Sequence, residues 1–148
     1  MDAVTALLRQ GITPEKVALA VALAAVLAVF PVLGSTTLLC AAAAALLGLN
    51  LPLMQLVNWL MYPVQLLLLI PLMNLGTRLF GFPLVPPLAQ LFHQVSADPW
   101  GVIRNFWPTA LAAIAAWVVL SPVVAGVIYA VLILPLRRFA PTREGAAG

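Results

Sequence analysis

The chain has 148 residues, of which 64% are hydrophobic and only 7% are charged, and its net charge is +3. Soluble domains are about 25% charged, so this composition excludes an ordinary water-soluble globular fold and predicts that lipid surrounds much of the chain. The net charge is positive, but the chain has no run of basic residues interleaved with aromatic ones. This argues against a nucleic-acid-binding protein.

The charged residues are confined to short stretches. None occurs from Val17 to Thr77 or from Asn105 to Leu136. A charge at the centre of a bilayer costs several kcal/mol, so both stretches are predicted to lie in the membrane with charges at its surfaces. The expected fold is all-α: a polytopic membrane protein that forms one domain over residues 1–148.

The first predicted element is an interfacial lead over residues 1–16. Within it, Thr13 is the expected N-cap of a helix and Pro14 its first residue. The apolar run 17–49 follows, which is too long for one ordinary span of about 20 residues. Pro31 and the Gly34–Thr37 segment interrupt this run near its centre. Two geometries remain open: a helical hairpin whose tip lies inside the membrane, or one long, kinked and tilted helix.

The second apolar run, residues 53–77, has the same plan. Asn50 and Pro52 are expected to open its first helix. Breaks are predicted between Asn58 and Pro63 and again at Pro71, where proline removes a backbone donor. Paired interrupted segments in membrane proteins point to a binding site where they meet.

The remaining elements are a polar interlude and a last span. Residues 84–105 predict interfacial amphipathic helices, one from about Pro87 to Ala97 and a second capped by Asp98. Residues 108–136 predict a transmembrane span kinked at Ser121 and Pro122. A basic tail over 137–148 then favours a multi-pass protein with a cytoplasmic C-terminus.

The candidate site consists of the two breaks, because backbone groups in hydrocarbon need local partners. Their polar residues either only satisfy the break, or face each other and bind an anion at the start of the helix near Ser35. One of the hydroxyls of Ser35, Thr36 and Thr37 is expected to cap that helix. On one helical turn, Asn58 and Tyr62 would share a face. Arg78 either reaches the interface or pairs with a lipid phosphate. The candidate binding residues are Gly34, Ser35, Thr36, Thr37, Asn58, Tyr62, Gln65 and Arg78, and the structural breaks are Pro31, Asn50, Pro52 and Pro63.

Catalytic chemistry is not expected. The apolar runs contain no carboxylate pair and no Ser-His-Asp set, and the chain has no nucleotide-binding glycine motif. We therefore expect no enzyme activity, no catalytic residue and no cofactor. His93 has no ligand partner at metal-binding spacing, so no metal site is predicted. Cys40 lies in an alanine-rich run and is expected to be a buried, inert thiol.

Several residues of the first half together carry a family resemblance: Gly11, Pro14, Pro31, Gly34, Thr36, Leu49-Asn50-Leu51-Pro52, Trp59, Pro63 and Gly76. With these residues, the first half of the chain resembles the bacterial domain of unknown function 2062 family. This resemblance implies a small protein of the bacterial inner membrane and carries no established activity. Some members of that family look fused or adjacent to polyprenyl-phosphate-dependent glycosyltransferases. The chain departs from the family at Tyr62-Pro63, where the family usually has Asn-Pro.

Two functions are therefore expected from different classes. The first is transport or handling of an anionic or lipid-linked, polyprenyl-phosphate-like substrate at the helix breaks. The second is a non-catalytic accessory or scaffold subunit of a membrane glycosyltransferase or another envelope complex. Membrane lipids are expected partners in both cases, and so is a second copy of the chain, because few helices enclose a polar site alone.

Overall fold

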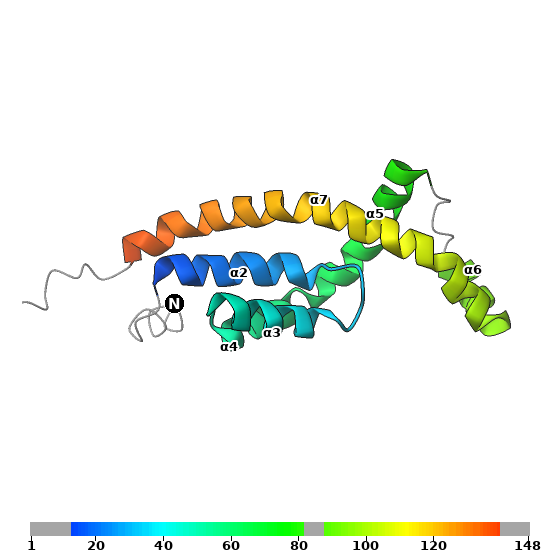
Figure 1. The fold of residues 1–148 in the computed structure, drawn as a ribbon, viewed down its shortest axis with the longest axis horizontal. Helices are drawn as coiled ribbons and strands as arrows, with labels where there is room; N and C mark the ends of the chain where they lie inside the picture. The colour runs from blue at the N-terminus through cyan, green and yellow to red at the C-terminus, as the bar shows by residue number, and fades with distance from the viewer. Residues whose placement is uncertain (1–12, 82–87, 140–148) are drawn as a thin grey trace, which may run out of the picture.

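The computed structural model describes residues 13–81 and 88–139, and within these ranges it is all-helical, as predicted (Figure 1). The interfacial lead over residues 1–12, the segment 82–87 and the tail 140–148 lie outside the described residues. The helices are α2 (Pro14–Ala28), α3 (Thr36–Leu47), α4 (Leu51–Leu60), α5 (Tyr62–Phe80), α6 (Leu88–Ala97) and α7 (Pro99–Phe139).

The first apolar run folds as a hairpin. Its first helix, α2, begins where the sequence predicted, because the Thr13 side chain accepts a hydrogen bond from the backbone N–H of Lys16 at 3.4 Å. After α2 ends, the chain turns through Gly34, whose φ of +85° suits glycine. The next helix, α3, packs back against α2. The two halves of this run fold back on each other, so the alternative of one long, kinked helix is wrong.

Small side chains let α2, α3 and α4 approach closely. Ala20 and Ala24 of α2 meet Cys40 and Ala44 of α3, and Met54 of α4 completes this buried cluster. Cys40 is fully buried and unpaired, as expected from its alanine-rich surroundings. Helices whose facing residues are small can pack backbone to backbone, which is the usual way for apolar helices to associate in lipid.

The second apolar run is broken once, and its halves do not fold back on each other. Asn50 caps α4 by accepting a hydrogen bond from the Leu53 N–H at 2.8 Å, as predicted. The break falls at Met61, and Pro63 lies in the first turn of α5. The α4 helix then packs on α2 and α3, whereas α5 packs on α7.

The predicted break at Pro71 is wrong, because α5 continues through it. A proline inside a helix removes one hydrogen bond, here to the carbonyl of Leu67. Ending the helix would leave several more backbone groups without partners, which is costlier in an apolar environment. The helix therefore tolerates the single lost bond.

The last helix, α7, is continuous over 41 residues. Asp98 caps it as predicted, since its Oδ1 accepts a hydrogen bond from the Gly101 N–H at 2.9 Å. The prediction of a separate interfacial helix followed by a span from residue 108 is wrong, because α7 runs through Pro108 and Pro122. Pro122 cannot donate to the Val118 carbonyl, and the Ser121 hydroxyl donates to that carbonyl instead at 3.4 Å.

The long helix α7 packs against both α2 and α5 (Figure 1). Its C-terminal half lies antiparallel to α2: Arg137 pairs with Glu15 at 3.1 Å at one end, and Trp117 contacts Val26 further along. Its N-terminal half packs on α5. Of the described helices, α5 and α7 are long and apolar enough to cross a membrane.

Candidate site at the helix breaks

A glutamine of the second break forms a hydrogen bond to the backbone of the first break. Gln65 lies in the first turns of α5 and is only 1% exposed. Its Nε2 donates to the backbone carbonyl of Phe30, directly after α2, at 2.9 Å. This bond satisfies a backbone acceptor that the helix end leaves open. The two breaks therefore lie against each other.

A second set of polar contacts joins α3 and α4. Asn58 is buried and its Nδ2 donates to the hydroxyl of Thr37 and to Oε1 of Gln55, each at 3.4 Å. Gln55 in turn donates to the backbone carbonyl of Thr37 at 3.0 Å. The amide groups thus bond to each other and to the start of α3. Gln55 was not singled out from the sequence, although its position one turn before Asn58 was a usable signal.

The expected side-chain cap of α3 is not formed. Ser35 is the N-cap residue, but its hydroxyl donates back to the Val32 carbonyl at 2.8 Å and makes no cap bond to the helix. Thr36 is buried and Thr37 is exposed at the first turn. The prediction that one of these three hydroxyls caps the helix is wrong, because the serine hydroxyl instead satisfies an acceptor of the turn. The first N–H groups of α3 have no side-chain cap.

Two predicted site residues lie apart from these contacts. Tyr62 is 50% exposed, whereas Asn58 is buried, so the expectation that they share one helical face is wrong. The break at Met61 interrupts the helix between them, so spacing along a single helix does not apply. Arg78 is exposed in the last turn of α5, about 24 Å along that helix from Tyr62 at 1.5 Å per residue.

A tryptophan that was not among the predicted site residues also contacts the first break. Trp117 of α7 donates its indole N–H to the Val26 carbonyl at 3.1 Å. Its ring meets Phe30 edge to face, with centroids 5.0 Å apart and an interplanar angle of 85°. An indole N–H in the middle of an apolar run needs an acceptor, and this was the available signal.

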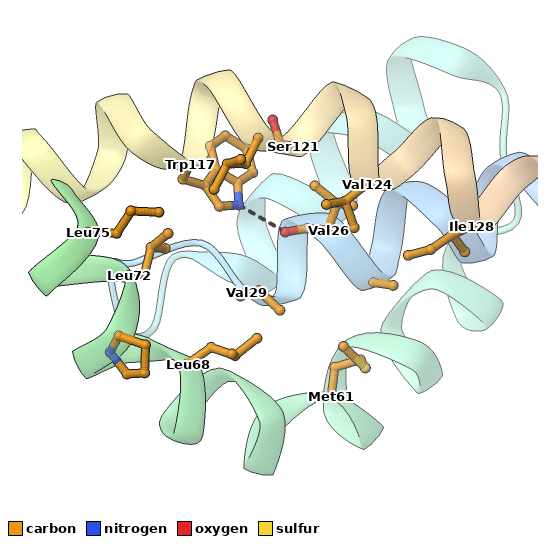
Figure 2. A pocket seen from close by; sticks show the side chains of 13 residues that line it. Val26, Val29, Met61, Leu68, Leu72, Leu75, Trp117, Ser121, Val124 and Ile128 are labelled. Atoms are coloured by element: carbon orange, nitrogen blue, oxygen red, sulfur yellow. Dashed lines mark hydrogen bonds between the residues drawn. The ribbon is translucent and has the colours of Figure 1, made fainter. Parts of the chain in front are cut away.

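An apolar pocket adjoins the break, between α2, α5 and α7. Figure 2 shows side chains from these three helices directed into it, with the indole of Trp117 at its edge. Its volume is about 350 Å³, within the roughly 300–1,000 Å³ of ligand pockets. The Ser121 hydroxyl is the polar side-chain group next to this indole. The lining residues include Val26, Val29, Met61, Leu68, Leu72 and Val124.

The break and the pocket share their walls. Val29, which follows α2, and Met61, which separates α4 from α5, both line the pocket. Phe30, next in sequence, carries the carbonyl that Gln65 binds. The arrangement is therefore amphiphilic: polar groups on the break side and hydrocarbon on the pocket side.

No grouping of three or more His, Cys, Asp or Glu side chains suited to a metal ion occurs in the part of the chain that the structure describes. No curated protein and no solved structure matches the chain. A family model described as "Uncharacterized protein conserved in bacteria (DUF2062)" matches residues 2–144. Because this match covers nearly the whole chain, the protein belongs to that family of uncharacterized bacterial proteins.

Proposed function

We propose that this chain is a multi-pass protein of the bacterial inner membrane that binds a lipid-linked anionic substrate of the polyprenyl-phosphate type. The apolar pocket holds part of the isoprenoid chain, and the helix breaks lie near the phosphate. The protein binds, moves or presents this substrate and does not transform it chemically. The shared wall of break and pocket at Val29 and Met61 is the observation that carries the proposal.

The exposed surface supports a membrane location. Large apolar side chains point outward from several helices, among them Leu46 at 84% exposure, Leu60 at 76% and Leu67 at 75%. A water-soluble monomer rarely exposes so many large apolar side chains. In lipid the same surface is in its favourable solvent, and the sequences of α2–α5 contain no charge between Val17 and Thr77.

The charged helix ends support an orientation. Glu15, Lys16, Arg137 and Arg138 lie where α2 begins and α7 ends, and Arg137 pairs with Glu15. Under the positive-inside rule we assign this end to the cytoplasmic surface. From there the 15 residues of α2 reach about 22 Å, which is less than the roughly 30 Å of a hydrocarbon core. The α2–α3 hairpin is then re-entrant, with its turn inside the bilayer.

The phosphate has donors available near the pocket. The connection from Val29 to Ser35 leads from the pocket wall to the start of α3, whose first N–H groups lack a side-chain cap. Uncapped N–H groups at a helix N-terminus attract anions. The amide groups of Gln55 and Gln65 hold the surrounding backbone in place through their hydrogen bonds to the carbonyls of Thr37 and Phe30.

Photo-crosslinking tests this proposal. The full chain in nanodiscs is exposed to a photoreactive polyprenyl phosphate, and labelled peptides are identified by mass spectrometry. We expect labels on pocket residues such as Leu68 and Val124. Leu72→Trp fills the pocket and should reduce labelling, whereas Leu67→Trp, at an outward position on the same helix, should not. Equal labelling of all three proteins, or labels spread evenly over the exposed surface, would contradict a binding pocket.

One observation favours the second candidate, a non-catalytic accessory subunit. The amides of Gln55, Asn58 and Gln65 are all engaged within the chain, as expected of residues whose task is to hold a break together. A scaffold would use the exposed apolar helices to bind a membrane glycosyltransferase. Recovery of such an enzyme in stoichiometric amount from solubilised membranes, together with no crosslinking to the lipid phosphate, would favour this function over the first.

A further inference from the structure

A second groove lies away from the helix breaks, at the charged end of the molecule. It is formed between the start of α2 and the C-terminal half of α7 and has a volume of about 380 Å³. We call its three polar lining residues, Glu15, Lys16 and Tyr129, the mouth. The other lining residues, which we call the floor, are small or aliphatic: Leu19, Ala22, Ala125 and Gly126.

We propose that this groove binds one anionic phospholipid, with its phosphate at Lys16 and Tyr129 and an acyl chain on the apolar floor. The inference rests on the membrane location proposed above, and it concerns a site separate from the pocket beside the breaks. Its polar mouth lies among the charged residues that we assign to the headgroup level, and its floor continues along α2 and α7 toward the break.

The charges at the mouth favour an anion. Glu15 is the acidic side chain there, and its Oε1 already accepts a hydrogen bond from Arg137 Nε at 3.1 Å. Among the described residues at this end, counting Glu15 as −1 and Lys16, Arg137 and Arg138 as +3, the sum is +2. A zwitterionic headgroup would gain nothing from this net charge, whereas an anionic headgroup would.

The ammonium group of Lys16 has hydrogen-bond donors available for a phosphate. Its ammonium group donates to the backbone carbonyl of Gly48 at 3.4 Å, which holds the side chain against the end of α3. An ammonium group carries three donors, so this bond leaves others for a phosphate oxygen. The Tyr129 hydroxyl is at the same mouth and can donate as well.

The floor is open enough for a hydrocarbon chain at Gly126. A Cβ atom added there would meet nothing within 4 Å, in contrast to Gly76, where it would meet the backbone of α7. A side chain at position 126 therefore begins in open space, at a residue that lines the groove. We use Gly126→Leu as the substitution that narrows the floor.

Native mass spectrometry of the full chain in mild detergent tests the proposal. Equal amounts of phosphatidylglycerol and phosphatidylcholine are added, and retained lipid is counted. We expect one tightly held phosphatidylglycerol and a roughly fivefold preference over phosphatidylcholine, the size expected for one lysine near an anionic headgroup. Lys16→Gln should remove most of that preference. Gly126→Leu should remove the retained lipid, and Val127→Leu, at an exposed neighbouring position, should change nothing.

The outcomes separate this inference from the proposed function. Equal retention of the two lipids, or unchanged retention in both Lys16→Gln and Gly126→Leu, overturns the lipid site. The pocket beside the helix breaks is tested separately, by the crosslinking experiment. A protein dimer without lipid, dissociated by Gly126→Leu, would assign the groove to a second copy and also overturn it. Recovery of the chain in the soluble fraction would instead remove the membrane location on which both proposals rest.

Discussion

At the residue scale, Gln65 is the side chain on which the first break depends most directly. It is almost fully buried, and it supplies the hydrogen bond to the Phe30 carbonyl, where α2 has ended and no helical donor follows. A backbone acceptor that is buried without a partner costs about as much as a lost hydrogen bond. One amide group therefore holds two distant segments, 35 residues apart, in contact.

We expect Gln65→Ala to destabilise the fold by about 1–3 kcal/mol, because it removes this donor and leaves a void. Thermal unfolding in a defined detergent, followed by circular dichroism, measures the loss. Gln90→Ala is the matched control, since Gln90 is exposed on α6. If the two variants unfolded at the same temperature, the Gln65–Phe30 bond would not stabilise the break.

At the scale of the elements, the contact between α5 and α7 depends on a glycine. A Cβ atom at Gly76 would lie 2.5 Å from the backbone C and O atoms of Ala112 and 2.7 Å from the N atom of Ala113. Backbone atoms cannot move aside as a flexible side chain can. The two helices approach this closely because glycine and alanine face each other.

We expect Gly76→Ala to destabilise the protein by about 1–3 kcal/mol, since it forces α5 and α7 apart. The control is Gly126→Ala in α7, which meets no atom within 4 Å and should stabilise the helix by up to about 1 kcal/mol. Unfolding temperatures of the two variants should therefore shift in opposite directions. Shifts of the same sign would contradict the close α5–α7 contact.

At the scale of the whole molecule, the ion pair between Glu15 and Arg137 joins residues 122 positions apart and closes the α2–α7 pair at one end. The pKa of Glu15 lies below its ordinary value of 4.5, first because its own backbone N–H bonds to the carboxylate, and then because of the hydrogen bond and charge of Arg137. Both side chains are largely exposed, so salt screens the pair and its contribution is small.

The sign of its pH dependence follows from this lowered pKa. A carboxyl group with a lower pKa in the folded state contributes stability above its unfolded value and loses it as the pH falls through the folded value. The unfolding temperature of the parent protein should therefore drop more than that of Glu15→Gln as the pH falls below 4.5. Added salt should reduce this difference. Parallel curves for the two proteins would mean that the pair contributes nothing.

The proposal that the α2–α3 hairpin is re-entrant can be tested on the whole molecule in a membrane. In a Cys40→Ala background, Gly48→Cys should react with a membrane-impermeant thiol reagent from the cytoplasmic side. Ser35→Cys, at the hairpin turn, should not react from the outer side, because α2 is too short to carry the turn across. Labelling of Ser35→Cys from outside would show that the hairpin crosses completely.

The sequence by itself determined those features that depend on neighbours a few residues away. Thr13, Asn50 and Asp98 cap their helices as predicted, because a capping side chain bonds to an N–H only two or three residues further along. The all-helical class and the break around Pro31 to Gly34 followed in the same way from composition and from proline and glycine.

Only the tertiary structure decided which breaks are real and what lies beside them. Pro71, Pro108 and Pro122 look like the other prolines in sequence, yet their helices continue, because a helix in apolar surroundings loses less by missing one bond than by ending. The pairing of Gln65 with Phe30 and of Trp117 with Val26, and the pocket between α2, α5 and α7, depend on helices distant in the chain. Local sequence patterns can show that a buried polar group needs a partner, but they do not specify which one, because the partner depends on how the helices pack.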